Sequence, residues 1–341
     1  MTVRDHLIKF AEETLGEAGS AAMELTLLTA RGSDRSFFRL KAETSTYILI
    51  RYDPARMENS YYAAITEFLR DIGLPVPRLI RHDPENHLML MEDMGQADLW
   101  SFRHDPWETR ETLYKKTLAV VYRLHSFPEK AFPIGRVRLM DEFNPRLYQW
   151  ERDYFKENFV TGACGIELEQ TFADELEMEL SALAGRLSAT THCLVHRDFQ
   201  SQNVMIRDGE PYLIDYQGMR FGSPFYDLGS LLLDPYVSLL EEEIEELLDF
   251  YYELSEWNID RTSFTDLFWD ASAERLMQAL GAYGFLGIKK GLAPFFAHIP
   301  AGIMNLRRAA SNASMLPRLR ELVDLCRTAW ISSHSYTPPL P

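Results

Sequence analysis

One short stretch of the sequence carries carboxylates and side-chain amides at close spacing. The stretch runs from Leu194 to Gly218 and reads LVHRDFQSQNVMIRDGEPYLIDYQG. A carboxylate such as Asp198 can orient an attacking hydroxyl and accept its proton. The amide of Asn203 and the carboxylate of Asp215 are oxygen ligands suited to a hard cation such as Mg²⁺, which neutralises charge on nucleotide phosphates. The stretch therefore predicts phosphoryl transfer from ATP, assisted by Mg²⁺.

Local structure has to bring the two predicted metal ligands together, and the sequence between them supplies it. The apolar-rich segments VMIR and PYLID flank Asp208 and Gly209, which tolerate the positive φ of a tight turn, so we expect a β-hairpin. A two-residue loop would set Asn203 opposite Ile214, and a three-residue loop would set it opposite Asp215. In either register the two ligands meet at the open end within about one residue, roughly 3.3 Å along a strand.

The rest of the sequence divides into two regions that differ in their predicted secondary structure. Residues 1–16 have the periodicity of an amphipathic helix. Strand-like runs follow in ELTLLTARG, SFFRLKAE and TYILIRYD, then a helical run from Glu58 to Ile72, then two strands in VPRLIRHDPENHLMLMED. From Met94 onward the pattern is mainly helical, over 107–126, 145–159, 170–188 and much of 235–330. We therefore predict an α+β chain with a small lobe, residues 1–93, holding an antiparallel sheet and a helix, and a larger helical lobe, residues 94–341.

The composition of the chain limits the classes of molecule that it is expected to bind. The chain has 341 residues with 35 Lys and Arg against 51 Asp and Glu, and its net charge of -16 opposes nonspecific binding to nucleic acid or anionic membranes. No uncharged run is long enough for a transmembrane helix. Cys164, Cys193 and Cys326 form no CxxC pair, which favours a reducing cytoplasm and apolar packing roles. We expect a monomer or weak dimer that acts on a small molecule.

The motif HRDFQSQNVM, followed by LIDYQGMRFGSPFYDLGSLL, resembles the aminoglycoside phosphotransferase and choline kinase family, a branch of the protein-kinase-like fold. The likeness extends from about Leu27 to Leu233. It implies a bilobal fold with ATP in the cleft, Asp198 as the catalytic carboxylate, and Asn203 and Asp215 as the Mg²⁺ ligands.

The same resemblance implies roles for other positions. Glu92, Asp93 and Met94 fall where the interlobe linker meets adenine. Glu67, on the predicted helix 58–72, matches the small-lobe Glu that pairs with a phosphate-binding Lys. His196 and Asp227 match groups that brace the catalytic loop.

Two departures from the family pattern concern the phosphate contacts. The strand TYILIRYD has no Lys; it offers Arg51, while Lys41 lies on the preceding strand, and we choose Arg51 as the phosphate contact. The loop GSDRSFFRL has a single glycine, Gly32, so the hydroxyls of Ser33 and Ser36 are expected to help its backbone N–H groups cap the phosphates.

These departures are similar to features of the bacterial cell-wall amino-sugar kinases, as are LPVPRLIRHDPENHLMLMEDMG and the IDYQ form of the metal strand. That resemblance implies phosphorylation of the anomeric hydroxyl of N-acetylmuramate or N-acetylglucosamine in peptidoglycan recycling. Two alternatives stay open. One is an aminoglycoside or choline-type acceptor, which the acidic charge balance would attract. The other is a nucleotide-binding pseudokinase, suggested by the missing strand Lys.

Overall fold

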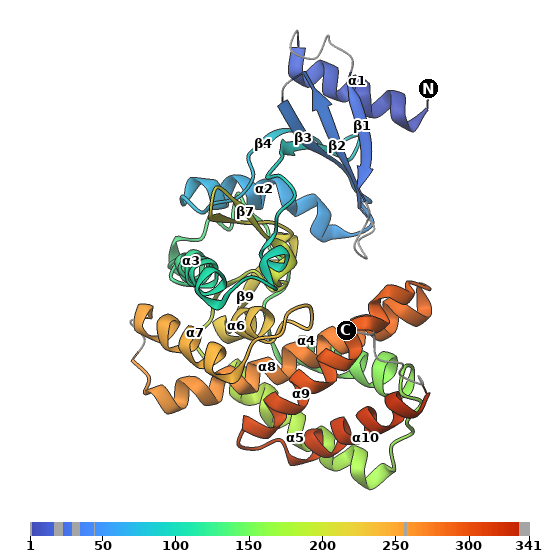
Figure 1. Cartoon of the computed structure of the whole chain (residues 1–341), viewed down its shortest axis with the longest axis vertical. Helices are drawn as coiled ribbons and strands as arrows, with labels where there is room; N and C mark the ends of the chain where they lie inside the picture. The colour runs from blue at the N-terminus through green and yellow to red at the C-terminus, as the bar shows by residue number, and fades with distance from the viewer. Residues whose placement is uncertain (1, 17–22, 29–34, 44, 256–257, 334–341) are drawn as a thin grey trace. The chain divides into compact units, whose positions relative to one another are not determined.

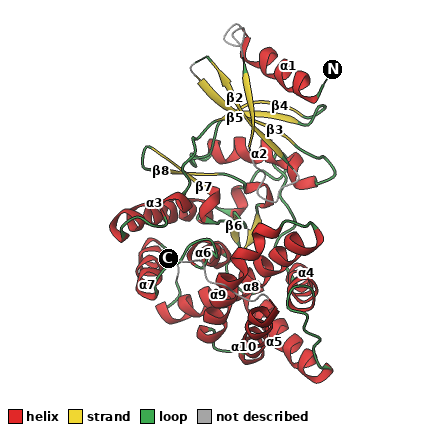
Figure 2. Cartoon of the chain, turned by 45° about the vertical axis from the view of Figure 1, so that its right-hand side comes forward, coloured by secondary structure: helices red, strands yellow, loops and turns green. Residues whose placement is uncertain are grey.

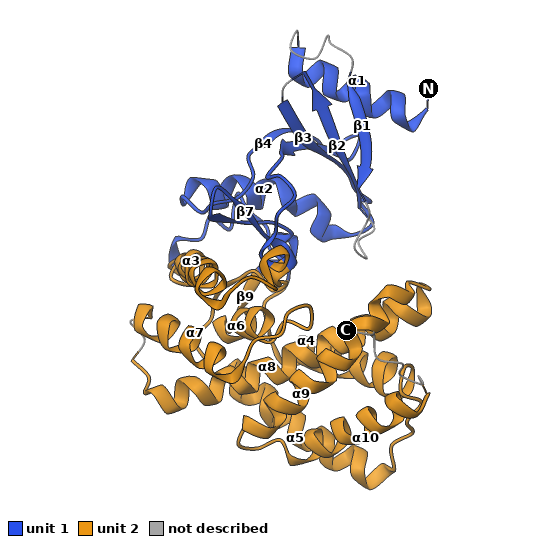
Figure 3. Ribbon diagram, viewed as in Figure 1, with its two compact units in different colours: residues 1–99, 130–140, 202–219 blue, residues 100–129, 141–201, 220–341 orange. Residues whose placement is uncertain are grey.

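The computed structural model describes residues 2–16, 23–28, 35–43, 45–255 and 258–333. It divides into two compact units (Figure 3). Unit 1 comprises residues 1–99, 130–140 and 202–219, and unit 2 comprises residues 100–129, 141–201 and 220–341. The grouping differs from a single boundary at residue 93, because the predicted hairpin and the segment 130–140 cluster with the first 99 residues. The lobe boundary at residue 93 stays a prediction.

Unit 1 is built on an antiparallel sheet in which the strands follow the order β1-β2-β3-β5-β4 (Figures 1 and 2). Neighbouring strands pair in the antiparallel sense throughout. The predicted α+β class with an antiparallel sheet near the N-terminus is therefore confirmed. The strand bounds are β1 (Glu24–Leu28), β2 (Ser36–Ala42), β3 (Ser45–Arg51), β4 (Leu79–Asp83) and β5 (Leu88–Glu92).

Helix α1 (Val3–Leu15) covers one face of this sheet. Its residues Leu7 and Phe10 join Leu40 and Leu49 of the sheet in one buried cluster. The helix begins at a capping box, in which Thr2 accepts a hydrogen bond from the Asp5 N–H and the Asp5 carboxylate accepts one from the Thr2 N–H. Because successive strand residues point to opposite faces, odd-numbered positions of β3 face α1 and even-numbered positions face away.

Helix α2 (Met57–Asp71) confirms the helix predicted over 58–72 and packs on a one-turn 3₁₀ helix, η6 (Tyr216–Gly218). The rings of Tyr62 and Tyr216 stack with centroids 4.7 Å apart, and the Thr66 and Tyr216 hydroxyls are 2.8 Å apart. The residue before η6 is Asp215. One face of α2 is thus fixed against the segment that carries a predicted metal ligand.

Unit 2 is mainly helical, as predicted (Figure 2). The long helix α8 packs against α4, α6 and α9, and most of its residues are buried. A short two-stranded sheet pairs β6 with β9. The helix and strand bounds are α3 (Trp107–His125), α4 (Pro145–Phe155), α5 (Gln170–Ser188), β6 (Cys193–Val195), β9 (Arg220–Gly222), α6 (Pro224–Leu232), α7 (Glu241–Leu254), α8 (Arg261–Gly284), α9 (Ile299–Asn312) and α10 (Pro317–Ser333).

Two features of composition can be compared with the structure. The three cysteines are buried thiols without disulfide bonds, in line with the predicted packing role. Within the described part of the chain, no helix is both long and apolar enough to cross a membrane.

The close approach of α8 to the turn after α4 generates a stability prediction. A Cβ added at Gly284 would lie 2.7 Å from the carbonyl carbon of Asn158 and closer still to its oxygen, so main chain would have to move. We expect Gly284→Ala to lower the free energy of unfolding by about 1–3 kcal/mol. Chemical denaturation of the variant and the wild type measures this difference.

Gly185 is the matched control, because it is an exposed glycine within α5 with nothing within 4 Å of an added Cβ. Gly185→Ala is expected to raise the free energy of unfolding by about 0.4–1 kcal/mol through the smaller entropy of the unfolded chain. Equal effects of the two substitutions would contradict the packing argument.

Candidate active site

The predicted hairpin forms in unit 1 from β7 (Val204–Arg207) and β8 (Glu210–Leu213). Arg207 pairs with Glu210, which leaves a two-residue loop. Asp208 and Gly209 both have positive φ, 54° and 73°, as a type I′ turn requires. The Ile214 N–H donates to the Asn203 carbonyl at 3.0 Å. The two-residue register is therefore the one adopted, with Asn203 opposite Ile214 and Asp215 one residue further.

Asp215 has a backbone conformation that non-glycine residues seldom adopt. Its φ of 65° and ψ of 31° place it in the left-handed region, at the start of η6. Such strain persists only where the surroundings hold the residue, and α2 supplies this hold through the Tyr62 and Thr66 contacts with Tyr216. The Asp215 side chain keeps 33% of its surface exposed. A carboxylate held in this way is suited to bind a ligand from solution.

The cation beside Asp215 is Arg35, which sequence reasoning missed. Its Nη2 donates to Asp215 Oδ1, and its Nη1 donates to Gln217 Oε1 at 2.9 Å. Burial disfavours the charge of Arg35, but the neighbouring Asp215 carboxylate outweighs this and the pKa of Arg35 is raised. Glu58 on α2 adds a further negative charge near Arg35. The sequence shows an Arg directly before SFFRL. The family pattern gave no reason to expect a cation at that position.

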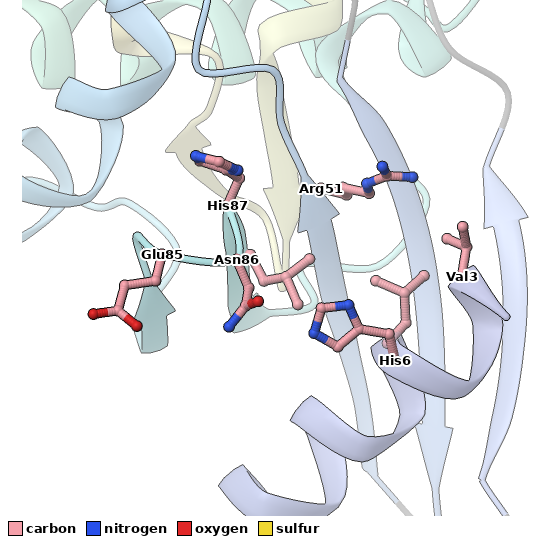
Figure 4. Close-up of a pocket in the computed structure, with 8 residues that line it drawn as sticks. Val3, His6, Arg51, Glu85, Asn86 and His87 are labelled. Atoms are coloured by element: carbon pink, nitrogen blue, oxygen red, sulfur yellow. The ribbon is translucent and has the colours of Figure 1, made fainter. Parts of the chain in front are cut away.

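Arg51 occupies a different place in unit 1. It ends β3, opposite Ser36 of β2, and its side chain is exposed. It lies on the α1 face of the sheet and lines a pocket of about 230 Å³ at the start of α1 (Figure 4). The lining residues are Val3, His6, Leu7, Arg51, Glu85, Asn86, His87 and Leu88. The structure therefore brings Arg35, and not Arg51, to the predicted metal ligand, because strand alternation turns residue 51 toward α1.

The other predicted phosphate contacts of unit 1 are also dispersed. Glu67 is exposed on α2, one residue beyond Thr66 and so about 100° around the helix from it. Glu67 lies near His82, whose pKa burial lowers although the charges of Asp83 and Glu67 act in the opposite sense. Ser36 begins β2 and is partly buried. Ser33 lies outside the described residues.

The segment after β5 is held by ion pairs within unit 1. Glu92 accepts a hydrogen bond from Arg207 Nη1 at 2.8 Å. Asp93 accepts from Arg39 Nε at 2.7 Å and from the Gly95 N–H at 2.9 Å. Met94 is buried. With these side chains engaged, adenine recognition by the segment would depend on its backbone groups. The adenine-contact role that the resemblance implies for the segment stays a prediction.

In unit 2, the Asp227 carboxylate, on α6, holds the loop that carries Asp198 through hydrogen bonds. The Asp227 carboxylate accepts hydrogen bonds from the His196 N–H at 2.6 Å and the Arg197 N–H at 2.8 Å. Its Oδ2 also lies 3.0 Å from His125 Nε2, and all of these groups except Arg197 are buried. Arg197 has a positive φ of 75°. Asp227 thus stabilises a strained turn immediately before Asp198.

A second buried carboxylate, which the sequence did not single out, holds the far end of the same loop. Asp234 Oδ2 accepts from both the N–H and the hydroxyl of Ser201, at 2.8 Å and 2.6 Å. Asp234 also accepts from the Tyr236 N–H at 3.0 Å. The loop from His196 to Ser201 is therefore fixed at both ends by carboxylates that are themselves saturated with hydrogen bonds.

Asp198 lies among arginines. Arg197 Nη1 is 3.1 Å from Asp198 Oδ2, and Arg275 Nη2, from α8, is 3.8 Å from Asp198 Oδ1. Burial raises the pKa of Asp198, but the charges of Arg197, Arg275, His196 and Arg220 outweigh it, so the pKa of Asp198 is lowered. This carboxylate stays ionised at neutral pH, as a group that orients and deprotonates a hydroxyl must be.

Glu151 of α4 also lies among the charged side chains around Asp198. It accepts from the Tyr226 hydroxyl at 3.1 Å and lies 3.7 Å from Arg197 Nη2. Burial raises the pKa of Glu151 above its ordinary value, although nearby arginines act against the rise. Burial lowers the pKa of Arg220 to about 10, which still leaves it charged at neutral pH. Three arginines, Arg197, Arg220 and Arg275, therefore act on Asp198 beside the buried carboxylate of Glu151.

Comparison with known proteins assigns this chain to a family of enzymes. Residues 24–263 match the model of the phosphotransferase enzyme family. An N-acetylmuramate/N-acetylglucosamine kinase of Pseudomonas aeruginosa is 23% identical over 92% of this chain and 91% of its own length. Choline kinase LicA from Streptococcus pneumoniae superposes with a TM-score of 0.57 at 16% identity, over 91% of this chain and 99% of that one.

A second solved structure, the ADP-bound aminoglycoside phosphotransferase APH(2'')-Ib, has a TM-score of 0.58 at 12% identity and covers 95% of this chain and 98% of its own. The predicted protein-kinase-like fold and the resemblance to aminoglycoside phosphotransferases and choline kinases are thereby confirmed. The family match spans more than half of the sequence and includes Asp198, Asn203 and Asp215. The chain therefore belongs to the phosphotransferase enzyme family, and it is a kinase whose acceptor is a hydroxyl group.

Proposed function

We propose that this kinase uses ATP and Mg²⁺ to phosphorylate the anomeric hydroxyl of an N-acetylated amino sugar, N-acetylmuramate or N-acetylglucosamine. The printed name of the Pseudomonas aeruginosa relative supports this substrate class, and that relative matches over nearly the whole chain. The ADP-bound neighbour supports an adenine nucleotide as the phosphoryl donor. The product, a sugar 1-phosphate, would suit nucleotide-sugar synthesis in a cytoplasmic recycling route.

The residue types fit the assigned roles. Asp198 would orient the acceptor hydroxyl and take its proton. Asn203 and Asp215 offer an amide oxygen and a carboxylate at the same end of one hairpin, which suits a hard cation. No group of three or more His, Cys, Asp and Glu side chains in the described ranges could hold a metal. An ion bound by Asn203 and Asp215 would therefore complete its shell with phosphate and water oxygens, as Mg²⁺ does in kinases.

The observation that carries the acceptor class is the charge around Asp198. Arg197 and Arg275 approach its carboxylate directly, and Arg220 adds a third positive charge. Glu151 and Asp234 lie nearby, and burial raises the pKa of each, which favours their neutral form. An ammonium-bearing acceptor would be repelled by the three arginines, whereas a neutral sugar or one with a carboxylate would not. The lactyl carboxylate of N-acetylmuramate is such a group.

The lowered pKa of Asp198 also agrees with an anomeric hydroxyl. A carboxylate with a low pKa is a weak base, and proton transfer to it is easier from a more acidic hydroxyl. The anomeric hydroxyl of a sugar is more acidic than an ordinary alcohol, because the ring oxygen withdraws electron density. Choline carries only an ordinary alcohol.

A cationic acceptor is the second candidate, and the overall charge of -16 favours it because an acidic surface raises the local concentration of cations. The names of the two structural neighbours point the same way. The arginines beside Asp198 argue against it, since local charge acts on a bound acceptor more strongly than distant surface charge. The pseudokinase alternative does not agree with the family match and the kinase-named relative, which support phosphoryl transfer to a hydroxyl.

The first test is a substrate panel. Purified protein, ATP and Mg²⁺ are incubated separately with N-acetylmuramate, N-acetylglucosamine, choline and an aminoglycoside, and the products are read by ³¹P NMR. We expect an anomeric phosphate from the acetylated sugars. Asp198→Asn should lower kcat by about 10²- to 10⁴-fold, the usual contribution of a positioned base, without loss of folding. Phosphorylation of choline alone, or full activity of the variant, would contradict the proposal.

The second test concerns the arginines. Loss of the Arg275 charge should raise the pKa of Asp198, because that charge favours the ionised carboxylate. The acid limb of the profile of kcat/KM against pH should therefore move to higher pH in Arg275→Gln. Arg307→Gln is the control, since Arg307 is on α9 and pairs with Asp324. An unshifted limb in Arg275→Gln, with wild-type folding, would contradict the electrostatic role of this residue.

A further inference from the structure

Arg35 holds one of the predicted metal ligands in the nucleotide-free chain. The guanidinium bridges Asp215 and Gln217, the first and third residues of the segment Asp215-Tyr216-Gln217. Only 6% of the Arg35 surface is exposed, while a third of the Asp215 side chain is exposed. The pair is therefore a largely buried ion pair with one open side at the carboxylate.

This arrangement places Arg35 in competition with a metal ion. Asp215 Oδ1 accepts the hydrogen bond from Arg35 Nη2. A divalent cation bound to the same carboxylate would lie within a few ångströms of the guanidinium, where two positive charges repel strongly in a poorly hydrated site. Metal binding at Asp215 therefore favours movement of the Arg35 charge toward a new anionic partner.

The surroundings keep Arg35 close to Asp215 when that happens. Its guanidinium carbon lies 5.3 Å from the centroid of the Phe37 ring and 5.9 Å from that of Tyr62. Such contacts attract a cation without a fixed direction of hydrogen bonding. Gln217 and the charge of Glu58 add polar partners on the same side. A small change of rotamer can thus redirect the Nη groups without removing the side chain from the site.

The nucleotide that accompanies the metal offers the new partner. A guanidinium presents a planar pair of donors that matches two phosphate oxygens. The strand that carries the phosphate-binding Lys in the family pattern ends here with Arg51, which faces α1 and lines the pocket beside it. Arg35, by contrast, is bonded to the predicted metal ligand Asp215.

We propose that Arg35 is a positioning residue that exchanges partners: it holds Asp215 in the nucleotide-free chain and contacts nucleotide phosphate oxygens once the metal–nucleotide complex binds. This proposal depends on the proposed function. It assigns to Arg35, from the loop before β2, the task that a strand Lys has in the family pattern. It also explains how a partly buried carboxylate is neutralised before the metal arrives.

Two binding measurements test the exchange without reliance on turnover. Electron paramagnetic resonance titration gives the affinity for Mn²⁺ alone, and calorimetry gives the affinity for the non-hydrolysable ATP analogue AMP-PNP with Mg²⁺. In Arg35→Ala we expect Mn²⁺ to bind more tightly, because its competitor is gone. AMP-PNP should bind roughly 10- to 100-fold more weakly, the effect of one lost hydrogen-bonded charge contact. Arg35→Lys should lie between the wild type and Arg35→Ala for AMP-PNP.

Two further variants sharpen the result. Arg81→Ala is the matched control, because Arg81 is a partly exposed arginine of unit 1 that lies 4.0 Å from Glu13; it should match the wild type in both assays. Arg51→Ala decides between the two candidate phosphate contacts. Loss of AMP-PNP affinity in Arg51→Ala, with Arg35→Ala unaffected, would overturn the proposal.

The remaining outcomes also decide. If Arg35→Ala binds AMP-PNP like the wild type, the phosphate contact is refuted, and if Mn²⁺ affinity does not rise, the competition is refuted. Should Arg35→Ala fail to fold, Arg35→Lys carries the test, because it keeps the charge and changes only the geometry. A wild-type chain that does not bind AMP-PNP would instead refute the proposed function, and the exchange with it.

Discussion

The buried carboxylate of Asp227 is the interaction on which the catalytic loop depends. A loop with a non-glycine residue at a φ of 75° is unfavourable by itself. Asp227 stabilises it by accepting hydrogen bonds from the two backbone N–H groups directly before Asp198. His125, whose other ring nitrogen lies 2.6 Å from the Tyr251 hydroxyl, supports the carboxylate from α3. Removal of one partner from such a buried ionic network commonly costs about 3–5 kcal/mol, so loop geometry and the core of unit 2 are coupled.

Electrostatics in this protein act in opposite senses at different ranges. The chain as a whole is strongly acidic, and its surface charge alone would have favoured a cationic acceptor. At Asp198 the local field has the opposite sense, because the charges of Arg197, Arg220 and Arg275 lower the pKa of this carboxylate against the effect of burial. Charges within a few ångströms are hardly screened by salt, whereas distant surface charges are. The arginines beside Asp198 therefore act on that carboxylate more strongly than the distant acidic surface does.

In unit 1, the cation beside the predicted metal ligand Asp215 comes from a different position than the one that the family pattern gives. Strand β3 uses its alternation to bury Leu49 against α1, and this turns Arg51 to the same face. Arg35 instead comes from the loop before β2 and pairs with Asp215 at a separation of 180 positions in the sequence. A family pattern that places the cation on the strand points to Arg51, whereas the side chain that pairs with Asp215 is Arg35, because the pattern specifies position along the chain and not the direction in which the side chain faces.

The sequence by itself determined the features that depend on residues close together along the chain. The Asp208-Gly209 turn defined the hairpin, since few residues adopt two successive positive φ values, and the strand and helix periodicities gave the elements of the α+β fold. The spacing of Asp198, Asn203 and Asp215 within 18 residues then predicted the chemistry. Only the tertiary structure decided the partners that come from remote segments: Arg35 for Asp215, Asp234 for Ser201, and Arg275 for Asp198. These pairs depend on how elements pack and on which face each side chain takes, and no local pattern encodes either.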